Sequence, residues 1–359
     1  MPATTRPALS GLPPYRPGRT AEDLARELGL DEAIKLASNE MAFGPLPSVV
    51  DAVTRTATGV NRYPDMYNRA LIAAIAERFE VDAERVTVGC GSVALVRHLA
   101  DAVLDPGDET LFGWPTFGVY GSAAVIAGGA AVRVPLRDHA LDVDDLIAGL
   151  TPRTRMVVVC TPNNPTSTHV PEAALRRLLE AVPRDVLVVL DEAYCHFVTA
   201  PDAVDGLALA REYDNVAVLR TFSKAYGLAG LRVGFCVADP AVTATLRKVV
   251  TTFSVSAVAQ AAAIACLEPA AEKELTDRVA EVVSERSRVT ERLAALGAAV
   301  PDSQANFLWL PLGERSATFA KECEKRGIIL RAFPDAGVRV TIGAPHENDA
   351  FLEAAAALL

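Results

Sequence analysis

The sequence predicts an α/β protein: a mostly parallel β-sheet sandwiched by helices, together with a smaller α+β domain. Three observations support this fold class. Between about residues 70 and 240, short apolar segments alternate with segments whose apolar residues recur at helical spacing. Several short segments are apolar throughout, as strands buried on both faces of a sheet are. Beyond about residue 240, long alanine-rich helical stretches replace this alternation.

The N-terminal region is expected to be mostly irregular, with one helix-like stretch at 22–28. Prolines recur through the first 17 residues, which favours an extended arm over a packed element. We therefore expect three parts: residues 1–45 as an N-terminal arm with part of the small domain, residues 46–245 as the large domain, and residues 246–359 as the small C-terminal domain.

The alternating region predicts both the strands and the helices of the large domain. Strands are expected at 85–88, 109–112, 131–134, 155–160, 186–190, 216–219 and 233–237. Helices are expected at 71–79, 93–104 and 171–182. Strands that alternate with helices form a parallel sheet covered on both sides, and ligands bind beyond the carboxyl ends of its strands.

The region after about residue 240 predicts the smaller domain. Helices are expected through 257–297 and near 316–326. Strands are expected at 306–310, 328–331 and 338–342.

Composition argues against several classes of partner and site. The formal net charge is −10 and no run is rich in Lys or Arg, so we expect no nucleic acid partner. No apolar run is long enough to span a membrane, and the N-terminus lacks the hydrophobic segment of a signal peptide, so a cytoplasmic location is expected. The cysteines and histidines are dispersed without metal-ligand spacing, so no metal site is expected.

Four polar segments each follow directly after a predicted strand. They are GCGS (89–92), TPNNPT (161–166), DEAY (191–194) and TFSK (221–224). Because the carboxyl ends of parallel strands meet at one edge of a sheet, we expect these segments to lie together. They would supply an anion-binding turn, an amide, an acid with a nearby phenol, and a lysine with hydroxyl groups.

Each segment taken alone also has a structural explanation. The turn at Gly91 can join a strand to a helix without a ligand, although its free N–H groups and the helix dipole suit a phosphate. Asn and Pro in 161–166 are common turn residues, and Asp191 can cap a helix. A lone lysine is usually a surface charge, but Lys224 lies between hydroxyl residues and an apolar stretch.

The combination resembles the fold-type I pyridoxal-phosphate aminotransferases, in the branch of histidinol-phosphate and aromatic amino acid aminotransferases. The resemblance extends from about Tyr15 to Gly343. The segments that carry it are KLASNE (35–40), RYPD (62–65), GCGSVAL (89–95), TPNNPT (161–166), DEAY (191–194), TFSKAYGLAGLRVGF (221–235), SQANFLWL (303–310) and GVRVTIG (337–343).

The resemblance implies a pyridoxal 5'-phosphate site in the large domain. It assigns Lys224 the Schiff base with the cofactor aldehyde, and Asp191 the pairing with the pyridine nitrogen. Tyr194 and Asn164 would hydrogen-bond the phenolic oxygen of the cofactor. The remaining cofactor residues would bind the phosphate or stack on the ring: Gly91, Ser92, Thr221, Ser223 and Arg232 for the phosphate, and Phe117 for the ring. Simple core packing is the alternative for Phe117.

The resemblance also implies substrate and subunit contacts. Arg339 would clamp the substrate α-carboxylate, with an internal salt bridge as the alternative. Tyr63 would reach the cofactor phosphate of a second subunit, which implies a homodimer. Asn39, Tyr15 and Arg331 fall at family positions near the substrate.

The implied reaction is a ping-pong transamination. Lys224 would act as general base on the α-proton, and a second 2-oxo acid, 2-oxoglutarate, would accept the amino group. GCGSVAL, FGW (112–114), FSVSAVAQ (253–260) and SQANFLWL resemble the actinobacterial aromatic, or phenylalanine, aminotransferases, so we expect an aromatic L-amino acid as donor.

Two alternatives to this function remain. The first is a histidinol-phosphate aminotransferase, which the segment PTFG (115–118) favours. The second, more remote, is a pyridoxal-phosphate-dependent amino acid phosphate decarboxylase. In addition, Ser167 stands where the family has glycine, which predicts a different backbone for that turn.

Overall fold

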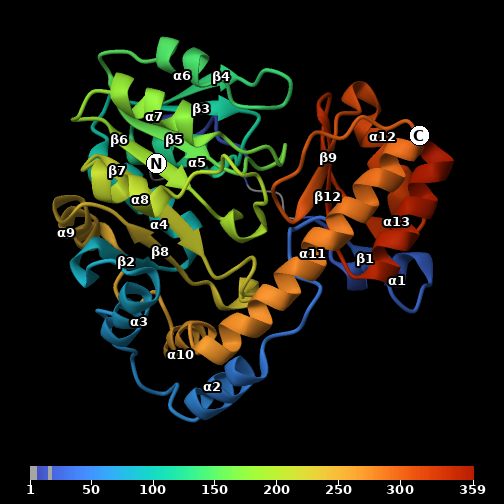
Figure 1. Cartoon of the computed structure of the whole chain (residues 1–359), viewed down its shortest axis with the longest axis horizontal. Coiled ribbons are helices and arrows are strands. Elements are labelled where there is room, and N and C mark those ends of the chain that lie inside the picture. Colours follow the sequence, from blue (N-terminus) through green and yellow to red (C-terminus); the bar gives the residue numbers. More distant parts are fainter. Residues whose placement is uncertain (1–5, 15–17) are drawn as a thin grey trace, which may run out of the picture.

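A computed structural model describes residues 6–14 and 18–359 of the chain. The described residues form a large lobe around a central sheet and a smaller lobe at the C-terminal end, and the long helix α11 (Pro269–Ala295) runs between them (Figure 1). The site predicted from the sequence lies on the side of the sheet that faces the smaller lobe.

The central sheet of the described residues has seven strands in the order β2-β8-β7-β6-β5-β3-β4. Their bounds are β2 Val86–Gly89, β3 Glu109–Trp114, β4 Ala130–Pro135, β5 Thr154–Cys160, β6 Leu187–Asp191, β7 Val216–Thr221 and β8 Gly234–Val237. Among these strands only β8 runs antiparallel to its neighbours. The predicted fold class, a mostly parallel sheet sandwiched by helices, is confirmed.

Helices cover both faces of this sheet because its central strands are apolar on both sides. On β5, Met156 and Val158 belong to one buried cluster, whereas Val157 and Val159 belong to the other. The first face is covered by α4 (Gly91–Val103), α5 (Val119–Ala127) and α9 (Pro240–Val249). The second face is covered by α6 (Val143–Ala148), α7 (Glu172–Ala181) and α8 (Gly206–Glu212).

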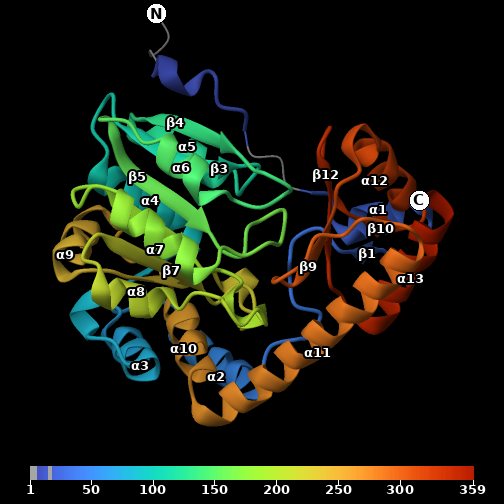
Figure 2. The ribbon, with the colours of Figure 1, turned by 45° about the horizontal axis from the view of Figure 1, so that its top comes forward.

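The smaller lobe combines two short sheets with helices. An antiparallel sheet has the order β11-β12-β9, and a parallel pair joins β1 to β10. The bounds of its elements are α1 Ala21–Leu28, β1 Ile34–Lys35, β9 Phe307–Leu310, β10 Ile328–Ile329, α12 Ser316–Glu324, β11 Arg331–Phe333, β12 Gly337–Thr341 and α13 Pro345–Leu358. Figure 2 shows that α1, from near the N-terminus, lies in this lobe.

The described residues that precede α1 include a short turn that does not lie in the smaller lobe. The turn Pro7–Leu9 lies beside the large lobe, where Arg6 Nη1 donates a hydrogen bond of 2.7 Å to the carbonyl of Ile126 at the end of α5 (Figure 2). The N-terminal region therefore touches both lobes.

Helices α2 (Pro47–Ala57) and α10 (Ala257–Cys266) pack against each other below the central sheet, close to the start of α11 (Figures 1 and 2). The sequence pattern did not predict α2. Helix α10 also contacts α3 (Arg69–Phe79), which packs against β2. We propose the expected two-domain division, and this packing favours a boundary near the start of α11 over one at residue 245.

Candidate active site

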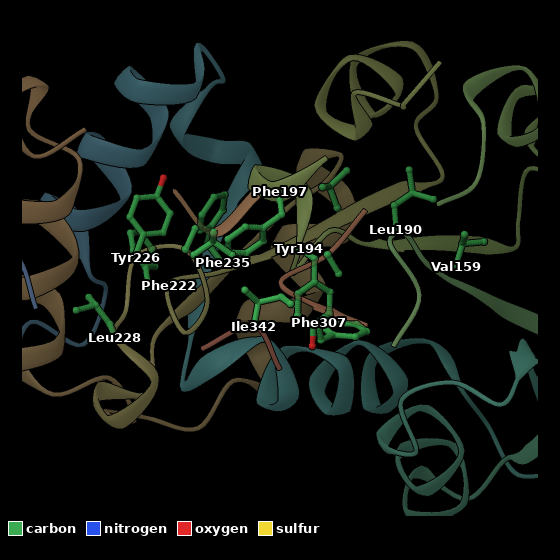
Figure 3. Packing of buried hydrophobic residues seen from close by; sticks show 14 of the residues in the cluster. Val159, Leu190, Tyr194, Phe197, Phe222, Tyr226, Leu228, Phe235, Phe307 and Ile342 are labelled. Carbon is green, nitrogen blue, oxygen red and sulfur yellow. The ribbon is translucent and has the colours of Figure 1, made fainter. Parts of the chain in front are cut away.

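The site forms where the carboxyl ends of β5, β6 and β7 meet. Asp191 is paired with Cys160 on one side and with Leu219 on the other. This register brings the segments that follow the three strands to one edge of the sheet, as the sequence predicts. The smaller lobe closes the site from the opposite side: the ring of Phe307 lies 5.0 Å from that of Tyr194, centroid to centroid (Figure 3).

Lys224 is half-buried at this edge and directs its amine toward the loop after β1. Its Nζ donates hydrogen bonds to the carbonyl oxygens of Ser38, at 3.0 Å, and Asn39, at 3.2 Å. Burial, reinforced by the positive charge of Arg339, lowers the pKa of Lys224 to about 7. A large share of this amine is therefore unprotonated at neutral pH, as a nucleophile or base requires.

Asp191 ends β6 and is only 3% exposed. Its Oδ2 accepts a hydrogen bond of 2.7 Å from Tyr120 Oη, and its Oδ1 accepts one of 3.2 Å from the backbone N–H of Ala193. Burial raises the pKa of Asp191 to about 6, and the hydrogen bond from Tyr120 opposes that rise. The expected alternative, a helix cap, is not what the structure shows, since the following residues form a turn rather than an α-helix.

Tyr194 and Asn39 meet between the two lobes. Asn39 Nδ2 donates to Tyr194 Oη at 3.0 Å, and the backbone N–H of Asn39 donates to Thr341 Oγ1 at 2.9 Å. Asn39 has a φ of 55°, a left-handed conformation that asparagine tolerates better than most residues. Burial raises the pKa of Tyr194, so its hydroxyl stays protonated in this environment.

Arg339 lies in the middle strand of the smaller lobe's antiparallel sheet and is buried. Its Nη1 donates to Asn164 Oδ1 at 2.5 Å, and its Nη2 donates to the carbonyl of Ala37. The guanidinium also lies 5.5 Å from the ring centroid of Phe307. Its side chain thus joins the segment after β5 to the loop after β1, across the site.

Groups that could bind an anion form a cradle at the start of α4. Gly91 begins this helix with a φ of 77°, and a Cβ at that position would collide with Nη2 of Arg232. Arg232 Nη1 donates to Ser223 Oγ at 3.1 Å, and the backbone N–H of Ser223 donates to Thr221 Oγ1 at 3.1 Å. A helix N-terminus faced by a guanidinium and hydroxyls suits a phosphate. Gly234 allows close packing here, because a Cβ added at this position would lie only 2.8 Å from the backbone nitrogen of Ser92.

The remaining predicted residues lie around this centre. Phe117 is half-buried, with its ring edge-on to Tyr120 at 5.8 Å between centroids. Arg331 lies directly opposite Arg339 across the β11–β12 pair. Tyr63 is 84% exposed, and its ring lies 4.7 Å from that of Phe253. Tyr15 lies outside the described residues.

The turn after β5 holds Ser167 in a left-handed conformation. Its φ is 64°, a value that glycine adopts readily, so serine here takes a backbone that is open to glycine, and the expected difference from the family's turn stays a prediction. The backbone N–H of Ser167 donates to the carbonyl of Asn163 at 2.7 Å, and the surrounding hydrogen bonds hold the turn.

Two features of the site escaped the sequence pattern. Tyr120 received no role, because nothing in the pattern of 119–127 shows which residue of that helix faces Asp191. Glu192 was quoted only as part of a motif. It is buried and pairs with Arg220, its Oε2 lying 2.7 Å from Arg220 Nη2, and its Oε1 accepts from the backbone N–H of Gly206 at 2.7 Å.

Two kinds of feature were sought among the described residues: a membrane-spanning helix and a cluster of metal ligands. No described helix is both long and apolar enough to cross a membrane. Nor does the described part of the chain group three or more His, Cys, Asp or Glu side chains that could hold a metal ion.

Comparison with known proteins identifies the family. The model of aminotransferase class I and II matches residues 31–358. The chain belongs to this family. It is therefore a pyridoxal-phosphate-dependent aminotransferase.

Named relatives of this aminotransferase cover its whole length. It is 50% identical to an aromatic amino acid aminotransferase of Thermobifida fusca, over 99% of this chain and 97% of the relative. It is 51% identical to an aromatic amino acid aminotransferase of Mycobacteroides abscessus, over 98% of both chains.

Solved structures share the fold. A histidinol-phosphate aminotransferase from Sinorhizobium meliloti, in complex with pyridoxal-5'-phosphate, superposes with a TM-score of 0.89 at 28% identity, over 99% of this chain and 98% of that one. An aspartate aminotransferase of Thermus thermophilus, a single mutant, superposes with a TM-score of 0.86 at 24% identity, over 99% of this chain and all of that one. These neighbours confirm a fold-type I aminotransferase.

Proposed function

We propose that this aminotransferase moves the amino group of an aromatic L-amino acid to a 2-oxo acid, 2-oxoglutarate, by a ping-pong mechanism. The observation that carries the substrate class is full-length identity of about one half to relatives named aromatic amino acid aminotransferases. The solved histidinol-phosphate aminotransferase shares the fold at a much lower identity of 28%.

The residues at the strand ends are placed to hold the cofactor. Pyridoxal phosphate, when bound, supplies an electron sink for the negative charge that develops at the substrate Cα. Asp191 would keep the pyridine nitrogen protonated, while Tyr194 and Asn164 would donate to the phenolic oxygen. Phe117 would cover the face of the ring.

The cradle at α4 would bind the cofactor phosphate. Gly91 and Ser92 offer backbone N–H groups at the helix N-terminus, and Ser223, Thr221 and Arg232 offer hydroxyls and a guanidinium. The hydrogen bond between Arg232 and Ser223 orients both groups before the phosphate arrives. Little rearrangement is therefore needed on binding.

Lys224 would act first as nucleophile and later as base. Its pKa of about 7 makes the amine available to bond the cofactor aldehyde at neutral pH. When its amine is free, Lys224 would act as the general base that takes the α-proton of the substrate and as the acid that hands it back.

Arg339 would bind the α-carboxylate of the substrate. Its Nη1 and Nη2 donate to neutral oxygens of Asn164 and Ala37, and a carboxylate is a stronger acceptor than either. Arg331, directly opposite on β11, and Asn39, beside Tyr194, would contact other parts of the substrate. The role expected for Tyr15 near the substrate stays a prediction.

We also propose a homodimer. Tyr63 is exposed together with other large apolar side chains of the same region, which we call the exposed patch: Val60, Tyr63, Met66, Tyr67 and Phe253. The rings of Tyr63 and Phe253 lie 4.7 Å apart, and exposed apolar patches mark interaction sites. A second copy of the chain would cover the patch and receive Tyr63 at its cofactor phosphate.

A half-reaction tests the substrate class. The enzyme loaded with cofactor is mixed with L-phenylalanine or L-histidinol phosphate, without an acceptor, and the absorbance band of the lysine-bound cofactor is followed. We expect fast loss of this band with phenylalanine and little with histidinol phosphate. The opposite order would assign the enzyme to histidinol phosphate instead. The Lys224→Ala variant, which cannot bond the cofactor, is the control.

A further inference from the structure

Tyr120 is a fully buried residue of α5 whose hydroxyl contacts the active site. It has 0% exposure, and its Oη donates a hydrogen bond of 2.7 Å to Oδ2 of Asp191. Its ring is fixed by edge-on contacts with Phe112, at 6.1 Å, and Phe117, at 5.8 Å between centroids. The phenol therefore has little freedom to leave the carboxylate.

Asp191 depends on this hydrogen bond because water does not solvate it. A carboxylate with 3% exposure is ionised only where neighbours replace the lost hydration. Its Oδ1 is satisfied by the backbone N–H of Ala193, and its Oδ2 by the hydroxyl of Tyr120. The backbone donor is independent of side-chain identity, so Tyr120 is the contact that a substitution can remove.

The other groups that face Asp191 both help and oppose its ionisation. Lys224 favours the charged carboxylate, whereas the negative charge of Glu192 disfavours it. Cys160, on the neighbouring strand, and Tyr194, three residues later in the chain, also face Asp191, and burial keeps both of them protonated. Tyr120 remains a donor at every accessible pH because its own pKa is raised by burial and by Asp191.

We propose that Tyr120 is a positioning residue that keeps Asp191 ionised and aims its carboxylate at the pyridine nitrogen of the cofactor. The proposal rests on the role of Asp191 in the proposed function. Tyr120 also supports Phe117, so one side chain contacts both the partner of the ring nitrogen and the residue expected to stack on the ring.

The test compares Tyr120→Phe with a matched control, Tyr213→Phe, which removes a phenol at the end of α8, away from Asp191. Infrared difference titration of the cofactor-free protein follows the Asp191 carboxyl, which Asp191→Asn identifies by loss of its signal. We expect the midpoint to rise from about 6 by about one unit in Tyr120→Phe and to stay in place in Tyr213→Phe.

Two further measurements separate positioning from packing. In the loaded enzyme, 15N-labelled pyridoxal phosphate reports protonation of the ring nitrogen, and Tyr120→Phe should lower the protonated fraction at neutral pH. The kcat for phenylalanine should fall about twofold at pH 7 and by up to about tenfold below pH 6 while its KM changes little, because a one-unit rise in the pKa of Asp191 from about 6 lowers its ionised fraction by about these factors. Tyr120→His, which retains a donor, should recover part of both losses.

Several results would overturn the proposal. An unchanged carboxyl midpoint in Tyr120→Phe would show that the phenol only fills space, and so would equal losses in Tyr120→Phe and Tyr120→His. If Tyr120→Phe does not fold, the Tyr120→His midpoint decides alone: a value near 6 supports the proposal, and a value near that of an unassisted buried carboxyl, well above 6, contradicts it. A failure of the proposed substrate class would appear separately, as an inactive wild type with phenylalanine, and would leave the carboxyl titration untouched.

Discussion

Lys224 has its amine where burial and a neighbouring positive charge outweigh the groups that favour its protonation. Burial and the positive charge of Arg339 lower its pKa well below that of an ordinary lysine, to about 7. Because the unprotonated amine is the reactive form, the rate at which the cofactor-free protein bonds pyridoxal phosphate should rise with pH, reach half its maximum near pH 7 and level off above about pH 8. Stopped-flow absorbance measures this rate. A rate that still rises steeply toward pH 10 would show an ordinary lysine.

At the residue scale, the sequence predicted the site residues that follow strands but not a residue that contacts the site from within a helix. Asn164, Asp191 and Lys224 could be placed together because parallel strand ends share an edge. Tyr120 could not, since the face of α5 that meets Asp191 is set by how the helix packs on the sheet. The roles of these residues remain predictions for the substitutions described above.

The start of α4 is the element most sensitive to a single added carbon. Gly91 has a φ of 77°, and a Cβ there would meet the guanidinium of Arg232. We expect Gly91→Ala to weaken pyridoxal phosphate binding by at least about tenfold, because the cradle must shift its arginine. Fluorescence titration of the cofactor-free protein measures this affinity.

Gly297→Ala provides the matched control for Gly91→Ala. Gly297 also has a positive φ, of 83°, but its Cβ would meet nothing within 4 Å. This variant should lose about 1–2 kcal/mol of stability and keep its cofactor affinity. Equal effects of the two substitutions on affinity would contradict the cradle.

The ends of β6 and β7 are tied together by the buried pair of Glu192 and Arg220. Arg220 Nη2 lies 2.7 Å from Glu192 Oε2, and the side chain of Glu192 is 2% exposed. Removing one partner leaves a buried charge, so Arg220→Met should lower the free energy of unfolding by about 3–5 kcal/mol. The double variant Glu192→Leu with Arg220→Met should lose less, which urea unfolding can measure. Additive losses would show that the two charges are independent.

At the element scale, buried strands were the most predictable feature. The segments predicted for β5, β6 and β7 are largely apolar, and their predicted ends lie within two residues of the observed ones. The pairing of β1 with β10 joins residues 34–35 to residues 328–329, and no local pattern reveals such a contact. Helix α2 went unrecognised, and its position against α10 is likewise a long-range feature.

At the scale of the whole molecule, the exposed patch faces solvent when the chain is alone. We expect a homodimer in sedimentation velocity, held together by Val60, Tyr63, Met66, Tyr67 and Phe253. Phe253→Glu should weaken the dimer by at least about tenfold, since a charge would be buried in an apolar contact. The control Leu296→Glu changes another exposed apolar residue, at the end of α11. A wild-type monomer at micromolar concentration would contradict the interface.

Fold class, family and chemistry were predictable for the whole molecule because many weak signals agree along the chain. The identity of the substrate could not be predicted in the same way. The same cofactor residues serve several amino donors, so the choice among them depends on side chains around the substrate rather than on strand ends. That choice is the least constrained part of the account and the one that most needs measurement.

The most direct test is competition between two donors in the complete reaction. Equal concentrations of L-phenylalanine and L-histidinol phosphate are supplied together with 2-oxoglutarate, and the two 2-oxo products are quantified by mass spectrometry. Their ratio equals the ratio of kcat/KM values. We expect the product of phenylalanine to exceed the other by at least about tenfold. An excess of the histidinol phosphate product would contradict the aromatic assignment and leave only the aminotransferase chemistry standing.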